Sequence, residues 1–384
     1  MEKFIGIHSM EIPSMVKLPN GKVCECCTER QKDKRMNPSK TVLVTGASGF
    51  IATHCILKLA SEGYKIRGTV RDFSRVDSLE KLLSAGLMKY YQASNLDVSW
   101  LQADLNADDG WTDAAKDCDF VLHVASPVTF SIHGEDELIA TARNGTLRVL
   151  KAASAAKVKR TVVTSSITAI SAGHHKDYNP FTEDTWSNVI NTDCSPYEKS
   201  KTFAERAAWD FLAKEPTAME ICTINPSLVF GPVLEEDIGE SVGVLREMLE
   251  GKYPLAPKLN FGIVDVRDVA EMHFLAMTRE EAPGNRFICN SETLSVLEVS
   301  KLVQKLYPDY KKRLPNRCAP DWLIKLGALF DPLLKLAVPM LGAASTYDHS
   351  KATKVLGWQP RRASEAIQGS VESLIDLGVI QSPS

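Results

Sequence analysis

The segment from Thr41 to Leu59 constrains the fold more than any other part of the sequence. A short β-branched apolar run, residues 41–45, is followed at once by Gly46-Ala-Ser-Gly49-Phe-Ile-Ala52 and then by an apolar-periodic stretch. Strand, glycine turn and helix start in this order indicate a dinucleotide-binding unit. Gly46 permits the tight turn, Gly49 lets the backbone approach a pyrophosphate, and Ala52 allows close packing of helix on strand. We therefore expect a nucleotide diphosphate at the N-terminus of this helix.

Strand and helix patterns alternate through the next 165 residues. We expect strands at 65–70, 100–104, 120–126, 160–166 and 220–225, and helices at 135–156 and 197–214. Such alternation predicts an α/β protein with a Rossmann-type doubly wound parallel sheet. Beyond Pro226 we expect a helix at 241–249, and a strand at 261–268 leading into a helix at 269–277 with Asp268 as N-cap. Asp265, Arg267 and Asp268 are interpreted as a capping and ion-pair group rather than as ligands.

Composition limits the class of protein. The chain has 384 residues, is 44% hydrophobic and carries a formal charge of −3, so we expect a globular protein that does not bind nucleic acid. Nine cysteines without a disulfide-like spacing favour a cytoplasmic compartment. The late apolar stretch, 322–344, is interrupted by charges, and its longest uncharged run, Leu336 to Tyr347, has twelve residues against the ~20 that span a bilayer. We expect broken helices that pack on the body of the protein, with association at a membrane surface as the alternative, and no membrane span.

The expected domains follow from these patterns. We predict a disordered extension at 1–38, in which Cys24, Cys26 and Cys27 lack the partners of a zinc site, so no metal is expected. We predict an NADP-binding domain at 39–227, to which 260–280 returns, and a smaller C-terminal α+β substrate lobe formed by 228–259 and 281–380.

Hydroxyl, phenol and amine groups gather at the predicted carboxyl end of the sheet. Ser165 and Ser166 end one strand, where open α/β sheets bind ligands. Tyr197 and Lys201 lie four residues apart on the following helix, so they share one face. A neighbouring ammonium stabilises a phenolate and so lowers the tyrosine pKa. The set predicts a tyrosine that acts as an acid or base on a carbonyl oxygen.

The end of the second strand indicates which dinucleotide is bound. Arg71 follows the strand directly, then Asp72, with Arg75 nearby. A guanidinium suits a 2′-phosphate, whereas an acidic residue would accept the 2′-hydroxyl of NAD. We favour NADP(H) over NAD(H). Asp104, at the end of the third strand, is a candidate for the adenine edge, and His123 is expected to be a buried imidazole rather than a catalyst.

Five motifs in order make the chain resemble the extended short-chain dehydrogenases/reductases, in the NAD-dependent epimerase/dehydratase superfamily, and within them the dihydroflavonol reductase-like branch of aldehyde and ketone reductases. These motifs are Thr45-Gly-Ala-Ser-Gly-Phe-Ile-Ala52, Ser165-Ser166, Tyr197-x-x-Ser-Lys201, Asn225-Pro-Ser-Leu-Val-Phe-Gly-Pro232 and Val264-Asp-Val-Arg-Asp-Val-Ala270. The resemblance covers about residues 40–378 and implies an NADPH-dependent carbonyl reductase acting on a small molecule, as a monomer or homodimer.

The resemblance also implies roles for single residues. Tyr197 would be the general acid, Lys201 would lower its pKa and hold the nicotinamide ribose, Ser166 would bind the substrate oxygen, and Asn144 would order a water near the lysine. Residues 226–232 would cover the nicotinamide, and Arg71 would bind the 2′-phosphate, with Arg75 replacing a second basic position that is Ser78 here. The expected cofactor contacts are Gly46, Ser48, Gly49, Phe50, Ile51, Arg71, Arg75, Asp104, Leu105, Val124, Ala125, Ser126, Tyr197, Lys201, Pro226 and Val229.

Other activities of the superfamily are alternatives. Sugar-nucleotide epimerases and dehydratases usually follow the serine with Val-Tyr-Gly, whereas Ile-Thr-Ala-Ile follows Ser166. Cinnamoyl-CoA reductases place Asn-Trp-Tyr-Cys before the tyrosine, where this chain has Asn191-Thr-Asp-Cys-Ser-Pro196, and a hydroxysteroid dehydrogenase would usually carry a membrane segment. A non-catalytic NADP-binding module would usually lack the tyrosine or the lysine. Substrate contacts are expected at 127–131 and Thr168.

Overall fold

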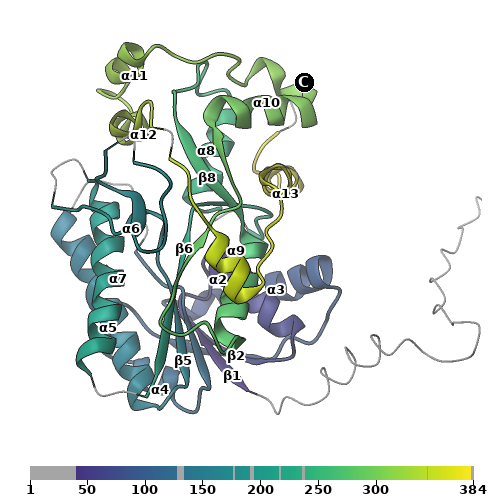
Figure 1. Ribbon diagram of the computed structural model, residues 1–384. Helices are drawn as coiled ribbons and strands as arrows, with labels where there is room; N and C mark the ends of the chain where they lie inside the picture. Colours follow the sequence, from purple (N-terminus) through teal and green to yellow (C-terminus); the bar gives the residue numbers. More distant parts are fainter. Residues whose placement is uncertain are drawn as a thin grey trace, which may run out of the picture. The chain divides into compact units, whose positions relative to one another are not determined.

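The computed structural model describes residues 40–127, 134–175, 178–190, 194–215, 218–235, 238–343 and 345–381 (Figure 1). The chain divides into two units, Met1–Ser39 and Lys40–Ser384. The predicted extension, its three cysteines, and residues 128–131 and 191–193 lie outside the described residues. The helices and strands of the fold lie in the second unit.

A seven-stranded parallel sheet organises this unit, which confirms the predicted fold class. Its strand order is β3-β2-β1-β4-β5-β6-β9. The strands are β1 (Thr41–Val44), β2 (Lys65–Val70), β3 (Val98–Gln102), β4 (Phe120–His123), β5 (Arg160–Thr164), β6 (Glu220–Pro226) and β9 (Arg286–Cys289). The order reverses between β1 and β4, and in open α/β sheets ligands bind at the carboxyl ends of the strands at such a point.

Helices cover both faces of the sheet. In Figure 1, α2 (Phe50–Ser61), α3 (Val76–Tyr91) and α9 (Val266–Thr278) lie on one side, and α4 (Trp111–Ala115), α5 (Glu135–Ala155) and α7 (Pro196–Lys214) on the other. Strand β1 shows why both faces are needed, because Val42 and Val44 belong to the core under α2 while Leu43 belongs to the core under α5. A strand that is apolar on both sides must be covered on both sides.

A second sheet of three strands, in the order β10-β8-β7, forms a smaller core. Its strands are β7 (Leu228–Phe230), β8 (Asn260–Asp265) and β10 (Glu292–Ser295), packed with α8 (Gly239–Leu249), α10 (Val296–Leu306) and α13 (Ala363–Asp376). The remaining elements are η1 (Phe73–Arg75), α6 (Thr168–Ser171), η2 (Pro308–Lys312), α11 (Asp321–Gly327), α12 (Pro332–Ala337), η3 (Val338–Met340) and the π-helical η4 (Ala352–Leu356).

Two predicted segments are each divided between the sheets. Of 260–280, which was expected to return to the first domain, α9 does pack on α2, but β8 belongs to the small sheet. Of 281–380, which was expected in the substrate lobe, β9 pairs with β6 at the edge of the large sheet. The chain therefore crosses between the two sheets more often than the predicted boundaries imply.

The predicted cap of α9 was wrong. The helix begins at Val266, and Asp265 is its N-cap, accepting a hydrogen bond from the Arg267 backbone N–H at 2.8 Å. Asp268 lies inside the first turn, where it is nearly buried and accepts a hydrogen bond from the Arg361 backbone N–H at 2.6 Å. The expected capping and ion-pair group is confirmed as a whole, because Asp265 pairs with Arg267 and Asp268 with Arg361.

The late apolar stretch forms short helices, as expected, but it does not pack entirely on the body. Ile324 is buried, whereas Trp322, Leu329 and Phe330 are 66%, 73% and 85% exposed. None of the helices in the described ranges is long and apolar enough to cross a bilayer.

Candidate active site

The helix that carries Tyr197 and Lys201 begins with a capping box. The Ser195 hydroxyl accepts a hydrogen bond from the Glu198 backbone N–H, and the Glu198 carboxylate accepts one from the Ser195 backbone N–H at 2.7 Å. Pro196 occupies the first turn, where its missing N–H is not needed. Glu198, which had no assigned role in the sequence, therefore fixes the start of α7 one residue before Tyr197.

Ser165 and Ser166 follow β5 and point to different partners. The Ser165 hydroxyl donates to Glu205 at 2.5 Å in the interior. The Ser166 hydroxyl oxygen accepts the Thr168 backbone N–H at 3.2 Å and is hydrogen-bonded to Tyr197. Ser166 accepts from Thr168 with one lone pair and donates its own proton to the Tyr197 oxygen, which is the direction in which this hydrogen bond lowers the tyrosine pKa. The structure thus brings Ser166 and Tyr197 together, as the sequence predicted.

The electrostatics of Tyr197 differ from the expectation. Burial raises the pKa of Tyr197, the hydrogen bond from Ser166 opposes this, and the charges of Glu240 and Glu198 raise it further. The Lys201 Nζ lies 5.9 Å from the centre of the tyrosine ring. Burial, and not Lys201, therefore sets the direction of the Tyr197 pKa shift, and it keeps the phenol protonated at neutral pH. A protonated phenol is the form that a general acid requires.

Lys201 is nearly buried, with 5% of its surface exposed. Burial lowers its pKa from 10.5 to about 8, although the charge of Glu205, one turn further along α7, raises it. The ammonium remains the major form at pH 7. It can therefore present a positive charge beside the phenol.

Glu205 is the centre of a buried polar network that the sequence did not reveal. Its carboxylate accepts hydrogen bonds from Ser165, Thr223 and Asn225 and pairs with Arg286 of β9 at 2.6 Å. The Asn225 amide also donates to the Ser166 carbonyl oxygen at 3.1 Å. The network therefore connects β9 to both the serine strand and the lysine helix. The one sequence feature that could have indicated Glu205 is its spacing of four residues from Lys201, which places both on the same face of α7.

Asn144 is not brought to the lysine. It is exposed on α5, whereas Ala142, Gly145 and Thr146 are buried. Two positions from Ala142 is about 200° around a helix, so Asn144 faces away from the sheet. The expected water-ordering role is corrected by this geometry. The next residue, Gly145, has a packing role instead, because a Cβ at this position would lie 2.8 Å from the Leu105 side chain.

His123 is a buried, hydrogen-bonded imidazole, as expected. Thr45 accepts hydrogen bonds at its hydroxyl from the backbone N–H groups of Val124 and Ala125, so its own proton points to His123 Nδ1 at 2.9 Å. His123 Nε2 then donates to Thr146 at 3.3 Å. Burial lowers the pKa of His123 to about 3, so the ring is neutral. It links β1 to β4 at the point where the strand order reverses.

The glycine turn leaves space for a ligand at the start of α2. Gly46 has φ +64°, and a Cβ there would lie 3.0 Å from Ala125. Gly49 is the N-cap of α2 and has no side chain to bind the first-turn N–H groups of Phe50 and Ile51. Ser48 is half-buried in the same turn. These open N–H groups are the donors that a diphosphate requires.

The three charged residues after β2 differ in their hydrogen-bond and ion-pair partners. Arg71 is exposed at the strand end, while the Asp72 carboxylate accepts hydrogen bonds from the Ser74 N–H and hydroxyl at 2.8 and 2.7 Å. Asp72 is thus the cap of η1, and each of its carboxylate oxygens already accepts a hydrogen bond. Arg75 pairs with Glu235 at 2.7 Å, so its charge is partly neutralised.

The third-strand residues also have structural partners. The Asp104 carboxylate accepts a hydrogen bond from the Asn106 backbone N–H at 2.8 Å, and the Leu105 carbonyl accepts one from Arg148 at 2.7 Å. Both residues are half-buried where β3 ends. Val124, Ala125 and Ser126 are half-buried after β4, so this edge of the sheet presents a row of partly open positions.

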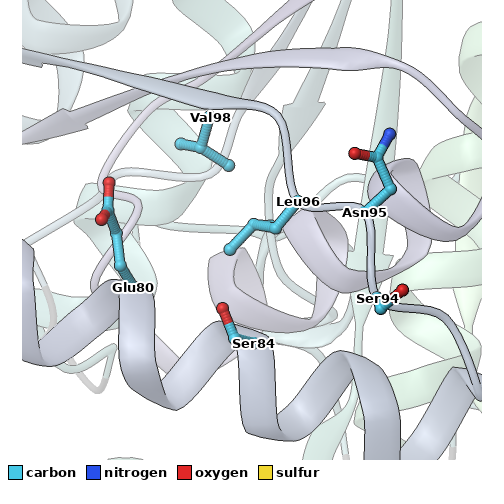
Figure 2. Close-up of a pocket in the computed structure, with 6 residues that line it drawn as sticks. All are labelled: Glu80, Ser84, Ser94, Asn95, Leu96 and Val98. Carbon is cyan, nitrogen blue, oxygen red and sulfur yellow. The ribbon is translucent and has the colours of Figure 1, made fainter.

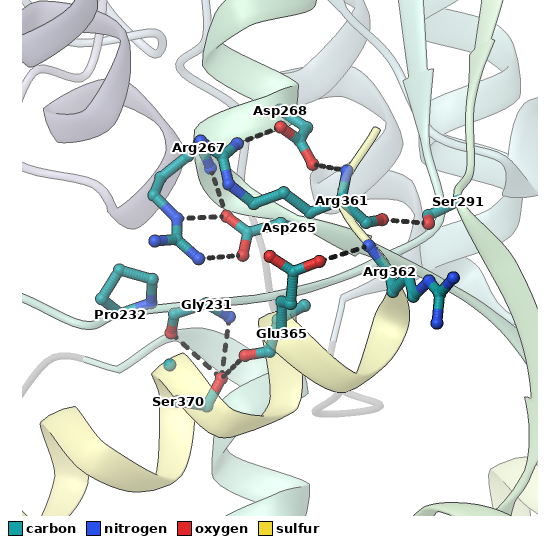
Figure 3. A network of polar contacts seen from close by, with 12 residues as sticks. Gly231, Pro232, Asp265, Arg267, Asp268, Ser291, Arg361, Arg362, Glu365 and Ser370 are labelled. Carbon is teal, nitrogen blue, oxygen red and sulfur yellow. Dashed lines mark hydrogen bonds and ion pairs between the residues drawn. The ribbon is translucent and has the colours of Figure 1, made fainter. Parts of the chain in front are cut away.

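The segment expected to cover the nicotinamide is held by the C-terminal helix (Figure 3). The Gly231 backbone N–H donates to the Ser370 hydroxyl at 2.8 Å, and this hydroxyl donates to the Gly231 carbonyl at 3.0 Å. Gly231 has φ +122°, and a Cβ would lie 2.9 Å from Val266. Pro226 and Val229 precede this clamp, nearly buried in β6 and β7. The role of α13 in fixing 231–233 could not be inferred from the sequence.

Thr168 lies within the candidate active site, whereas a surface hollow beside α3 lies outside it. The Thr168 hydroxyl is buried beside Ser166 and has no hydrogen-bond partner within the described residues, while of 127–131 only Pro127 is described. Figure 2 shows a hollow between α3 and the loop before β3, lined by Glu80, Ser84, Ser94, Asn95, Leu96 and Val98. None of the predicted site residues lines it, so it is separate from the candidate active site.

Comparison with known proteins agrees with this geometry. The sequence profile of the NAD dependent epimerase/dehydratase family matches residues 42–289. An NADPH-dependent methylglyoxal reductase of Saccharomyces cerevisiae is 30% identical over 354 residues, covering 87% of this chain and 98% of its own. A dihydroflavonol 4-reductase of Arabidopsis thaliana is 33% identical over 285 residues, covering 72% of each chain. The Candida albicans protein Gre2, solved with NADPH, superposes with a TM-score of 0.71 at 28% identity over 88% of this chain and 99% of its own.

Proposed function

The chain belongs to the NAD dependent epimerase/dehydratase family, and from this premise we propose that Ser166, Tyr197 and Lys201 are its catalytic residues. The protein is an NADPH-dependent oxidoreductase that reduces a ketone or aldehyde to an alcohol, an activity in line with its methylglyoxal and dihydroflavonol reductase relatives. The observation that carries the residue assignment is the hydrogen bond between Ser166 and Tyr197 beside the nearly buried ammonium of Lys201.

The residues present fit two groups of NADPH, its diphosphate and its 2′-phosphate. The open N–H groups at the start of α2 suit a diphosphate. Gly46 has no Cβ that would press on Ala125 in the same turn. Exposed Arg71 suits the 2′-phosphate, because Asp72 is already bound to Ser74. When bound, NADPH supplies the hydride.

Residues of the chain would bind the carbonyl oxygen of the substrate and transfer a proton to it. The Ser166 hydroxyl donates a hydrogen bond to the substrate oxygen and so orients the carbonyl. As negative charge develops on that oxygen, the Tyr197 hydroxyl gives up its proton to it. The Lys201 ammonium stabilises the phenolate that remains and donates hydrogen bonds to the nicotinamide ribose. Asn144 has no part in this scheme, because it is exposed on the far face of α5.

Paired variants test the assignment. Tyr197→Phe should lower kcat for a carbonyl substrate by about 10³-fold or more with little change in the Kd of NADPH, since only the proton donor is removed. NADPH oxidation with methylglyoxal, diketones, 2-oxo esters and flavonoid ketones, with NADH alongside, measures turnover, and fluorescence titration measures binding. Tyr178→Phe is the matched control, since Tyr178 is an exposed tyrosine away from α7.

Two results would count against the proposal. A Tyr197→Phe variant that still reduces carbonyls removes Tyr197 as the acid. Wild-type protein that binds NADPH but never consumes it favours a sugar-nucleotide epimerase or a binding module, because neither uses the cofactor up.

We also propose a cytoplasmic location and a small-molecule substrate for a monomer or homodimer. All six cysteines that the structure describes are free thiols, which suits a reducing compartment. Size-exclusion chromatography with light scattering would give the number of subunits.

A further inference from the structure

Apolar side chains gather on the surface between residues 306 and 340. Of the twelve large apolar side chains that are exposed in the described part of the chain, six lie in this segment: Leu306, Trp322, Leu326, Leu329, Phe330 and Met340. Figure 1 shows α10, α11 and α12 at the same end of the unit that begins at Lys40. Single exposed apolar residues are normal, but such a concentration marks an interaction surface.

Four of these side chains form one stripe, which we call the α11 face: Trp322, Leu326, Leu329 and Phe330. Trp322 and Leu326 lie one helical turn apart on α11, and Leu329 and Phe330 lie in the turn that directly follows it. This face is 66%, 50%, 73% and 85% exposed in that order, while Ile324 anchors the other side in the protein. A helix that docks only on its own protein would turn its apolar stripe inward. The α11 face is turned outward instead.

Basic residues surround this stripe. Between residues 301 and 340 there are eight Lys or Arg against three Asp or Glu, a net charge of +5 in a chain whose formal charge is −3. Two of the three acidic residues are already paired, Asp321 with Lys258 and Asp331 with Lys252. Within the described ranges none of the eight basic side chains takes part in an ion pair, and all but Arg313 are exposed.

We propose that the α11 face docks on an anionic lipid bilayer, with Trp322 and Phe330 entering the headgroup boundary and the lysines and arginines of 301–335 contacting lipid phosphates. Aromatic and leucine side chains beside exposed lysines are the pattern of helices that lie in a membrane interface. A negative leaflet attracts such a basic segment. The contact is peripheral, since no helix in the described ranges can span a bilayer.

Charge favours lipid over a second copy of the chain. In a two-fold dimer the same patch faces itself, so a segment of +5 would meet an identical segment of +5. Like charges across an interface oppose association. An anionic lipid surface complements the charge and covers the apolar stripe at the same time.

Vesicle flotation of the full chain tests the proposal. We expect the protein to float with vesicles of mixed phosphatidylcholine and phosphatidylserine, to float much less with phosphatidylcholine alone, and to be released as salt is raised. Leu329→Ser with Phe330→Ser should lower the partition coefficient by roughly tenfold or more, because two exposed apolar side chains no longer enter the lipid. Ile190→Ser is the matched control, because Ile190 is 92% exposed and lies far from this segment in the sequence.

A second measurement does not depend on the double variant. In vesicles with brominated acyl chains, part of the tryptophan fluorescence should be quenched in wild type, and this quenching should be lost in Trp322→Phe. The three altered positions, Trp322, Leu329 and Phe330, are all exposed, and NADPH oxidation by each variant reports whether it is folded.

Three outcomes overturn the proposal. Wild-type protein that does not float with anionic vesicles shows that the α11 face does not bind lipid. A Leu329→Ser, Phe330→Ser variant that floats like wild type places the lipid contact elsewhere. Wild type that sediments as a dimer without lipid, and as a monomer when these two residues are changed, assigns the face to a second copy instead.

Discussion

Burial changes the pKa of Lys201. An ammonium that is 5% exposed has a pKa of about 8 instead of 10.5, so it loses its proton in a range where ordinary lysines keep theirs. Tyr197, beside it, has a pKa raised by burial, so the two groups occupy the states that proton donation requires at neutral pH. Catalysis by this pair is therefore expected to be limited on the alkaline side by the lysine.

The pH profile tests this. kcat/KM for NADPH should fall as pH rises through about 8, because the deprotonated amine stabilises neither the phenolate nor the ribose contact. Lys201→Met should be slower by about 10²-fold or more and should lack this inflection. Lys199→Met, a change on the same helix at a residue paired with Glu135, should keep it. An unchanged inflection in Lys201→Met would assign the titration to another group.

Arg71 and Arg75 are expected to contribute unequally to the binding of NADPH. Arg71→Ala should raise the KM for NADPH by about tenfold and leave that for NADH nearly unchanged, because a charge-assisted contact to the 2′-phosphate is lost. Arg75→Ala should have a smaller effect, since Arg75 is already paired with Glu235. Initial rates with both cofactors measure this, and equal losses with NADPH and NADH would show that Arg71 does not read the phosphate.

At the scale of elements, the site is held by contacts between segments far apart in sequence. Glu205 of α7 joins Ser165 after β5, Asn225 of β6 and Arg286 of β9. Arg286 also donates to the carbonyls of Glu183 and Thr185, and its guanidinium lies 3.8 Å from the centre of the Trp186 ring. The position of the serine strand end relative to the lysine helix is thus held by a buried network centred on the ion pair of Glu205 with Arg286.

Removing the charge of Glu205 should therefore be costly. Glu205→Gln should lower the free energy of unfolding by roughly 3 kcal/mol, because Arg286 is left charged and unpaired in the interior. Urea unfolding measures this, with Glu215→Gln, at the exposed end of α7, as a control expected to stay within about 0.5 kcal/mol of wild type. A Glu205→Gln protein as stable as wild type would mean that the pair does not hold these elements together.

Three histidines are buried among the residues that the structure describes, and they lie on different elements of the fold. His54 of α2 hydrogen-bonds the Pro232 carbonyl, His123 joins β4 to β1, and His273 of α9 contacts Thr164 of β5. Burial lowers their pKa values to about 4, about 3 and about 4. All three must stay neutral while the protein is folded, and all three bind protons near pH 6.5 once it unfolds.

Acid should therefore destabilise the fold well above the pKa of ordinary carboxylates. The unfolded chain binds more protons than the folded one between pH 6.5 and about 4, so stability falls as pH falls through this window. The loss at pH 5 is about 2 kcal/mol per histidine relative to pH 7.5. Urea unfolding at both pH values measures it, and His273→Gln should reduce the slope, whereas Ser84→Ala, at an exposed site, should not. Equal stability at the two pH values would contradict this account.

The sequence by itself determined the features that depend on local pattern. The bounds of β2, the glycine turn before α2, and the start of the helix bearing Tyr197 and Lys201 all follow from spacing within a few residues. Strand and helix periodicity is written along the chain, because each element must turn its apolar positions to a neighbour. This was enough to predict the sheet and to bring a serine of the pair 165–166 towards Tyr197, while the choice of Ser166 came from the resemblance to the family.

Only the tertiary structure decided which distant segments meet and which surfaces stay uncovered. Arg286 pairs with Glu205 across 81 residues, Asp265 and not Asp268 caps α9, and Asn144 turns to solvent. The α11 face has a helical apolar pattern in the sequence, but whether anything packs on it depends on where the other elements lie. Long-range pairing and exposure are properties of the whole packed chain, so no local pattern encodes them.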